Sequence, residues 1–406
     1  MIEVRVIEPE ELPAMVQAMG QGFGFDLDPR GGEGWSQTLE RDRTRCAFDG
    51  AEIIGTSGAH SFQLAVPGAT LPAGGTTVVT VRATHRRCGV LRSMMQAHFE
   101  DVRERAEPLA VLWASEAGIY GRFGYGCASE LAAIEVERAH GSFARPVVPG
   151  GDLRLLDGDT ARTELPTLYE SLWRARPGSF ARSDRWWDAR HFSDPASMRG
   201  GASALRRVLY ERGGVARGFL QYRTRMRNDG HGLPRGELQI VDLHGADAEA
   251  RAALWNYSLS VDLIDRVTWW NAPIDDPLAW LLADPRRVMR RLRDGLWLRV
   301  IDLPRALAAR RYACAGRLVL RVQDTLFADN DGTWLLDGCP DGATCTRTSA
   351  RSDVELDAEA LGAIYLGGIR PSVLAHAGRI HGAAAVLARA DAMFGWSPLP
   401  WCPEIF

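Results

Sequence analysis

The stretch VVTVRATHRRCGVLRSMMQAHFEDVRERAEPLAVLWASEAGIYGRFGYG, from Val78 to Gly126, places four features in succession. An apolar run at 78–81 predicts a buried strand, and the chain then passes through arginines and a glycine into a helix. The inward side of that helix consists of residues at three- and four-residue spacing, namely Leu91, Met94, Met95, His98, Phe99 and Val102. A second apolar strand at 109–114 and a glycine-rich turn at 118–125 follow, so we expect an α/β fold.

The start of this helix is suited to an anion. Its first amide hydrogens and the positive end of the helix dipole point at one place. Gly89 lets a phosphate approach the backbone, and Arg86 and Arg87 add positive charge. The alternative is a solvated helix start, because Arg-x-x-Gly arises by chance in an arginine-rich chain.

The spacing Arg86-x-x-Gly89 between a strand and a helix matches the pyrophosphate loop of the GNAT acetyltransferases, which bind acetyl-CoA. The longer stretch ATHRRCGVLRSMM, followed by ASEAGIYGRFGYG, closely resembles the Eis family, GNAT enzymes that acetylate amines, including aminoglycosides. That family shares Leu91, and the stretches 293–313 and 361–375 look like its C-terminal domain. The resemblance covers the whole chain. It implies a fold of the α/β (α+β) class, with tandem GNAT-like domains followed by a sterol-carrier-like domain.

The resemblance also implies a cosubstrate site and a general acid. Acetyl-CoA is the implied cosubstrate, and its implied contacts are Val79, Val81, Arg86, Arg87, Gly89, Val90, Leu91 and Ser115. Acetyl transfer needs a neutral amine, a polarised thioester carbonyl and a proton for the departing thiolate. A tyrosine suits the last task, because it is protonated at neutral pH. Tyr120 falls on the family's proposed general acid, while Tyr125 lies close by and is not excluded by chemistry alone.

The segment GFGFDLDPRGGEGWSQTL, at 22–39, is rich in glycine, aromatic residues and acids. Aromatic rings with carboxylates suit a cationic amine, which stacks on a ring and pairs with a carboxylate. The candidates for substrate contact are Phe23, Phe25, Asp26, Asp28 and Trp35. For each of them the alternative is ordinary packing in a mobile surface loop.

We divide the chain into a catalytic GNAT domain at 1–148, a second GNAT-like domain at 149–291 and a sterol-carrier-like domain at 292–406. Strands before the central stretch are expected at 2–6, 45–48, 52–59 and 63–66. The second domain repeats the order of elements, but its strand-to-helix junction reads LHGADAEARAALW, with Asp247 and Glu249 where the anion site should be. We therefore expect no cofactor loop there, and a role as a wall of the substrate cavity.

The tail GWSPLPWCPEIF, at 395–406, is apolar, and its three prolines forbid a helix. Its hydrophobicity predicts burial, with the α-carboxylate of Phe406 carried into a pocket. In the resembling family that carboxylate lies in the active site and helps to deprotonate the amine. Phe406 is therefore the second implied catalytic residue, and Glu404 is a candidate assistant in substrate binding. The alternative is an apolar tail that only completes a core.

Composition limits the class of protein. The 406 residues suggest two to four domains, and 46% hydrophobic with 24% charged residues is typical of soluble globular proteins. A net charge of -3 argues against a nucleic-acid partner, and no apolar run approaches a membrane span. The acidic N-terminus is unlike a signal peptide, and seven cysteines without a Cys-x-x-Cys motif indicate free thiols in the cytoplasm. No histidine pattern predicts a metal site.

The leading hypothesis is an acetyl-CoA-dependent N-acetyltransferase acting on amine groups, with aminoglycoside-like or other polycationic amines as implied acceptors. The resemblance also implies a homo-oligomer, a hexamer. The alternative is a non-enzymatic carrier that binds an apolar ligand in the sterol-carrier-like domain. The intact loop from Arg86 to Gly89, together with Tyr120, favours the enzyme, because a scaffold has no need of them.

Overall fold

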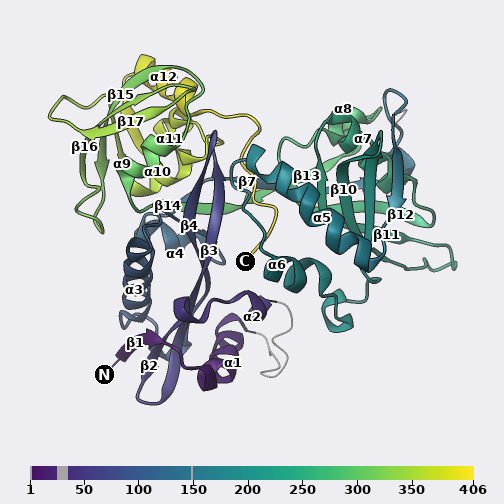
Figure 1. Ribbon diagram of the computed structural model, residues 1–406, viewed down its shortest axis with the longest axis horizontal. Helices are drawn as coiled ribbons and strands as arrows, with labels where there is room; N and C mark the ends of the chain where they lie inside the picture. The colour runs from purple at the N-terminus through teal and green to yellow at the C-terminus, as the bar shows by residue number, and fades with distance from the viewer. Residues whose placement is uncertain (1, 25–34, 148–149) are drawn as a thin grey trace. The chain divides into compact units, whose positions relative to one another are not determined.

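A computed structural model describes residues 2–24, 35–147 and 150–406 of the chain (Figure 1). Their contacts define two compact units. The first contains Met1–Ser129, Ala175–Ala181 and Asp294–Phe406, and the second contains Glu130–Arg174 and Arg182–Arg293.

The first unit is built on a seven-stranded sheet. In spatial order its strands are β1 (Ile2–Val6), β2 (Arg45–Asp49), β3 (Glu52–Val66), β4 (Ala69–Val81), β5 (Leu109–Trp113), β14 (Leu296–Val300) and β6 (Gly126–Cys127). The helices α1 (Leu12–Phe23) and α3 (Val90–Glu104) lie on opposite sides of the β3–β4 hairpin, and the short helices are α2 (Trp35–Thr38) and α4 (Ala117–Tyr120). The inward residues expected for α3 are buried, apart from Leu91 at its first turn, which is only partly buried.

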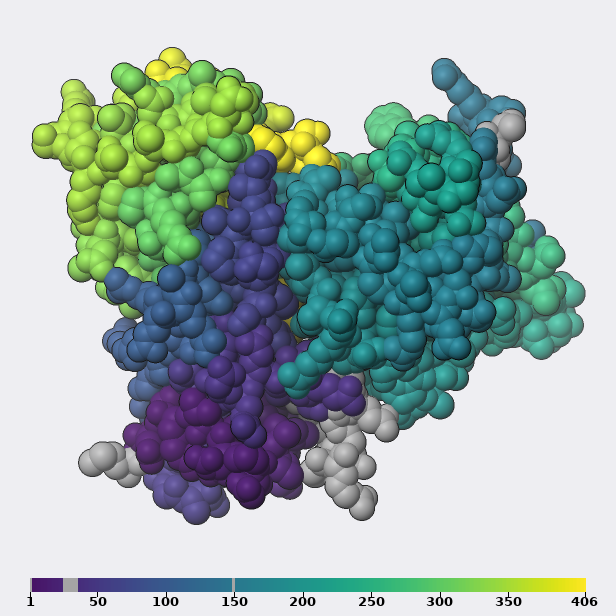
Figure 2. Space-filling view, viewed as in Figure 1, coloured from purple at the N-terminus to yellow at the C-terminus, as the bar shows by residue number. Residues whose placement is uncertain are grey.

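The β3–β4 hairpin is longer than the sequence pattern suggests. Separate strands were expected at 52–59 and 63–66, but both belong to a single strand of 15 residues, β3. In β4, two glycines leave room for neighbouring side chains: a Cβ on Gly74 would lie 2.6 Å from Val102, and one on Gly75 would lie 2.2 Å from Phe62. The hairpin tip meets the C-terminal domain, where the Arg311 amide donates to the Pro67 carbonyl at 2.8 Å (Figure 2).

The strands β4 and β5 separate before either ends. Their parallel pairing runs from Ala73 opposite Leu109 to Thr76 opposite Leu112, although β4 continues to Val81. Beyond the last pair, the ladder between β3 and β4 shifts register, and Val78 has a φ of 49°. This β-bulge turns the end of β4 away from β5 and leaves a gap at the carboxyl end of the pair.

The second unit is built on another seven-stranded sheet, with two main helices, α5 (Gly158–Leu172) and α7 (Ala248–Ser260). Its strands, in spatial order, are β13 (Met289–Asp294), β7 (Glu130–Glu137), β12 (Ile264–Pro273), β11 (Gly236–Gly245), β10 (Val215–Arg225), β9 (Arg206–Arg212) and β8 (Asp152–Leu155). Shorter helical segments are α6 (Asp184–Trp186), a π-helix at Trp187–Phe192 and α8 (Leu278–Leu281).

The strands do not follow the domain boundaries expected at 148 and 291. Strand β7 precedes residue 148 but pairs with β12 in the second sheet, whereas β14 follows residue 291 but lies between β5 and β6 in the first. Each sheet is thus completed by a strand from beyond the expected boundary. Both strands have apolar residues that suit either sheet, so local pattern does not reveal the exchange.

The C-terminal domain combines five strands with four helices. The sheet order is β17 (Ala343–Arg347), β16 (Gly332–Gly338), β15 (Gly316–Gln323), β18 (Val354–Asp357) and β19 (Ile380–Gly382). The helices are α9 (Leu303–Ala309), α10 (Ala358–Tyr365), α11 (Pro371–His376) and α12 (Ala384–Phe394). The buried Arg310 donates to the carbonyl oxygens of Tyr365 and Phe394, where α10 and α12 end.

The apolar tail is buried for part of its length. Trp401 and Cys402 are 2% and 1% exposed. The Trp401 amide donates to the Pro177 carbonyl at 2.8 Å, in a short segment that also pairs with β3 through Phe180 and Leu64. The tail is therefore held against the first unit by main-chain hydrogen bonds.

Candidate active site

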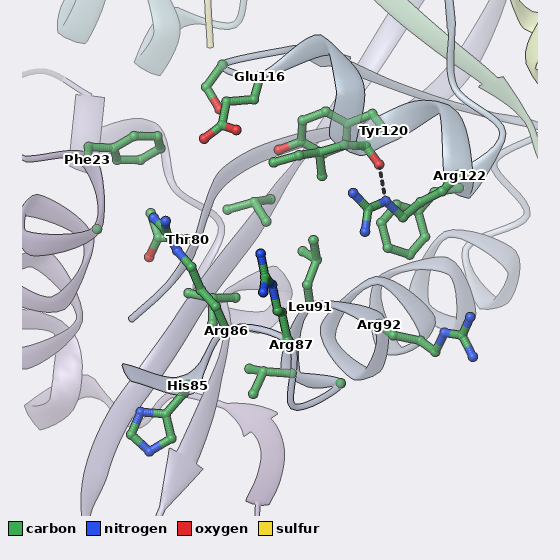
Figure 3. A pocket seen from close by; sticks show the side chains of 18 of the residues that line it. Phe23, Thr80, His85, Arg86, Arg87, Leu91, Arg92, Glu116, Tyr120 and Arg122 are labelled. Carbon is green, nitrogen blue, oxygen red and sulfur yellow. Dashed lines mark hydrogen bonds between the residues drawn. The ribbon is translucent and has the colours of Figure 1, made fainter. Parts of the chain in front are cut away.

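A cleft of about 800 Å³ opens where β4 and β5 separate (Figure 3). It contains all of the cosubstrate contacts expected from the sequence, namely Val79, Val81, Arg86, Arg87, Gly89, Val90, Leu91 and Ser115. Tyr120 and Phe23 also line it. Leu326, from the connection between β15 and β16, reaches the same cleft, a contribution that no motif in the sequence indicates.

The start of α3 forms the basic side of the cleft. Its N-cap residue Gly89 has a φ of 84°, provides no side-chain cap and has open space where a Cβ would be. The amides of the first turn therefore have no acceptor within the helix. Arg86 and Arg87 extend into the cleft, and Arg92 also lines it, with its guanidinium turned away from those of Arg86 and Arg87. Among the described residues, no carboxylate pairs with Arg86 or Arg87, so their charge is available to an anion.

The corresponding helix of the second unit has a different start. Asp247 caps α7, and its Oδ1 accepts from the Ala250 amide at 2.8 Å while its Oδ2 accepts from Arg217 at 2.7 Å. The bond from the Ala250 amide is the main cause that lowers the pKa of Asp247, so the carboxylate stays ionised. The protein's own anion thus occupies the position that an external phosphate would take in the first unit.

Tyr120 ends α4 and lies at the cleft, with 5% of its surface exposed. Burial raises the pKa of its phenol to about 12, and a hydrogen bond with Ser115 partly offsets this increase.

Glycines let the turn after Tyr120 pack closely. A Cβ on Gly124, where φ is 78°, would lie 2.9 Å from the Arg299 guanidinium, and one on Gly126 would lie 2.0 Å from the Glu359 carbonyl oxygen.

The structure separates the two tyrosines that the sequence leaves as alternatives. Tyr125 is fully buried and does not line the cleft. Its hydroxyl is hydrogen-bonded to Thr76 Oγ1 at 2.9 Å, and that oxygen is bonded to His98 Nε2 at 2.7 Å. Burial lowers the pKa of His98 to about 3, so the imidazole is neutral. Of the pair, Tyr120 is the residue placed to reach a ligand.

The remaining expected site residues either lie outside the described residues or do not line the cleft. Phe25, Asp26 and Asp28 lie outside the described residues, and Trp35 begins α2. Glu404 and Phe406 do not line the cleft of Tyr120. The ring of Phe406 instead packs on β3, with ring centroids 4.8 Å from Phe62 and 5.9 Å from Phe180. His60, beside Phe406, carries no sequence signal beyond being a single histidine in a strand.

Residues 2–24, 35–147 and 150–406 hold no group of three His, Cys, Asp or Glu side chains arranged to bind a metal. Within the same ranges no helix has both the length and the apolar character needed to cross a membrane.

Comparison with known proteins supports the order of domains. Residues 3–128 and 178–300 each match an acetyltransferase (GNAT) domain, and residues 303–403 match a sterol carrier protein domain. The expected fold, tandem GNAT domains followed by a sterol-carrier-like domain, is confirmed.

Relatives match over nearly the whole chain. An uncharacterized N-acetyltransferase of Streptomyces avermitilis is 37% identical over 410 residues, which cover 100% of this chain and 99% of the relative. The N-acetyltransferase Eis of Mycobacterium bovis is 32% identical over 404 residues, 95% of this chain and 94% of the relative. The crystal structure of Eis1 from Mycobacterium abscessus has a TM-score of 0.86 at 30% identity and covers 100% of both chains. The chain therefore belongs to the Eis family of GNAT N-acetyltransferases.

Proposed function

We propose that the protein transfers the acetyl group of acetyl-CoA to an amine of a polycationic acceptor, such as an aminoglycoside. The observation that carries the proposal is the uncapped, basic start of α3 in the same cleft as Tyr120. Bound acetyl-CoA would supply the activated acyl group. Arg86, Arg87 and the first-turn amides of α3 would hold its diphosphate.

The end of β4 supports the placement of the thioester. Val79 and Val81 lie beyond the last pair with β5, so main-chain groups on that edge are available to pantetheine and to the thioester carbonyl. A backbone amide aimed at that carbonyl would stabilise negative charge as it develops on oxygen. Tyr120, on the facing side of the cleft, would then donate its phenolic proton toward the sulfur.

Release of CoA thiol from acetyl-CoA in the presence of a panel of amines tests the function. We expect release with aminoglycosides and alkyl polyamines. A lipid in place of the amine serves as the control for the carrier hypothesis. Absence of release with every amine would contradict the proposal.

The cellular location and the oligomeric state are proposed on the basis of the family resemblance. We propose a cytoplasmic enzyme, because acetyl-CoA is supplied there, and its seven cysteines are free thiols. A closed homo-oligomer, a hexamer, is proposed from the resemblance.

Replacing Arg86 with alanine should weaken acetyl-CoA binding by about 1 to 3 kcal/mol, the range for one charge-assisted hydrogen bond. Gly89→Asp should weaken it further, because a negative charge would then occupy the phosphate position. Arg103→Ala is the matched control, since Arg103 lies in the last turn of α3 and does not line the cleft. Calorimetric titration measures all three. Wild-type affinity in both Arg86→Ala and Gly89→Asp would move the phosphates elsewhere.

Saturation should come at one acetyl-CoA per chain. The start of α7 is already capped by Asp247, which repels phosphate and uses the amide that would bind it. Titration of a known protein concentration gives the stoichiometry. Two molecules bound per chain would show that the second unit retains a cosubstrate site.

A further inference from the structure

The cleft at the start of α3 is lined by two more arginines, which the proposed function does not use. Arg92 lies in the first turn of α3, and Arg122 lies in the 3₁₀ turn that follows α4. In the view of Figure 3 both lie toward one side of the cleft, Phe23 lies toward the other, and Arg87 lies between. The cleft therefore has a second basic region in addition to the loop that would hold the diphosphate.

The arm of Arg122 is fixed by one hydrogen bond, in which its Nε donates to the Ile119 carbonyl oxygen at 3.0 Å (Figure 3). A guanidinium has further N–H donors on its two terminal nitrogens, and these match the oxygens of a phosphate. In the part of the chain that the structure describes, no carboxylate forms an ion pair with Arg122 or Arg92. Both side chains are thus available to an anion.

The acids near this region do not cancel its charge. Asp324 lies behind the turn of Arg122 but pairs with the buried Arg299 at 2.6 Å. Glu359, in the same place, pairs with Arg379 at 2.8 Å. Of the described residues that line the cleft, only Glu116 is acidic, and Figure 3 shows it apart from both arginines. The second basic region therefore keeps its positive charge.

Apolar side chains lie beside Arg122. Phe123 and Leu326 line both the cleft and a smaller cavity of about 280 Å³ together with it, which places the three residues next to one another. Leu326 is 37% exposed, but its main chain is held, because its amide and that of Phe327 donate to Asp324 Oδ1 at 3.1 and 3.0 Å. A fixed apolar surface beside a positive charge suits a ligand that joins a flat ring to an anion.

CoA has such an end. Its diphosphate is attached to a ribose that also carries adenine and a separate phosphate on the 3′-oxygen, so the second anion is close to the first. On the protein, Gly89 caps α3, and Arg92 follows it by three residues, or about 4.5 Å along the helix axis. The two basic regions of the cleft are therefore near neighbours, as the two anionic groups are.

We infer that Arg122 and Arg92 bind the 3′-phosphate of acetyl-CoA, an inference that rests on the proposed function. Phe123 and Leu326 border the adenine. The loop from Arg86 to Gly89 keeps the diphosphate, so each anionic group has its own arginines. The protein then distinguishes CoA from dephospho-CoA, which lacks the 3′-phosphate and is otherwise the same molecule.

Calorimetric titration of the full-length protein with CoA and with dephospho-CoA tests the inference. We expect the wild type to bind CoA about 10-fold to 100-fold more tightly, as two charge-assisted contacts from exposed arginines would give. In the double variant Arg92→Gln/Arg122→Gln this preference should fall to less than about threefold, because glutamine keeps a polar side chain but not the charge. Its affinity for dephospho-CoA should change by less than about threefold.

Arg86→Ala is the matched control, because both ligands contain the diphosphate. It should weaken both by the same factor and leave the preference for CoA intact. In the double variant, kcat at saturating acetyl-CoA should stay within about twofold of the wild type, since the lost contacts affect binding alone.

Three results would overturn the inference while leaving the transferase intact. These are a wild type that binds both ligands equally, a double variant that keeps the wild-type preference, and a double variant that loses affinity for both ligands equally, as a purely structural role predicts. A wild type that binds neither ligand would overturn the proposed function, and the inference with it.

Discussion

Tyr120→Phe should lower turnover by about 10²-fold to 10⁴-fold while acetyl-CoA binding changes little. The substitution keeps the ring that packs beside Tyr125 but removes the proton that the departing sulfur requires. Steady-state kinetics with calorimetric binding measures both quantities. Unaltered turnover would assign the proton to water.

Burial determines how this proton moves. A phenol with a pKa of about 12 is protonated throughout the physiological range. A thiol in water has a pKa of about 8.5, so full transfer to a solvated thiolate would be unfavourable. The departing sulfur is in the same cleft, however, where desolvation raises the pKa of a thiol as well. Tyr120 would therefore act first by hydrogen-bonding the sulfur as negative charge develops.

Tyr125→Phe is the matched control for Tyr120→Phe. The Tyr125 hydroxyl is bonded to Thr76, away from the cleft. Its removal should cost about 1 to 3 kcal/mol of stability, because it leaves a buried partner unsatisfied, and should leave turnover nearly unchanged. A catalytic loss confined to Tyr120→Phe would separate chemistry from core packing.

A short glycine-serine extension after Phe406 should nearly abolish acetyl transfer, with a loss of about 10²-fold or more if the carboxylate orients the amine. Every side chain remains in place, including the Phe406 ring against Phe62 and Phe180, while the negative charge is moved away. Acetyl-CoA affinity and thermal stability should be nearly intact. Initial rates of thiol release, together with a melting curve, provide the measurement.

The same extension placed before Met1 is the control for added length. Full activity in the protein extended after Phe406 would remove the carboxylate from the mechanism.

The central stretch of the site was predictable because its signals are local. The strand at 78–81, the glycine before the helix and the turn at Tyr120 each depend on neighbours within a few residues, and the helix begins at Val90 as expected. The length of β4 was not predictable, since Gly74 and Gly75 look like breaks until the side chains that fill their space are known.

Other features depend on contacts between distant parts of the chain. No pattern in the sequence states that Tyr125 is bonded to Thr76 and His98, which is what withdraws it from the cleft. Likewise, nothing in the sequence indicates that the ring of Phe406, at the end of the chain, packs beside His60 and Phe62 on β3. Contacts of this kind cannot be inferred from the sequence until the fold is known.

The exchange of β7 and β14 also governs how the chain can be made. As the ribosome releases the chain from its N-terminus, β5 and β6 emerge early, but β14, which lies between them, follows only after nearly the whole second unit. Until β14 has been synthesised, β5 has an unpaired edge, and unpaired strand edges promote aggregation. A protein cut at residue 148 would keep that edge permanently and would carry β7 without β12. The two seven-stranded sheets therefore have to be synthesised in one chain, and neither is complete when it is made alone.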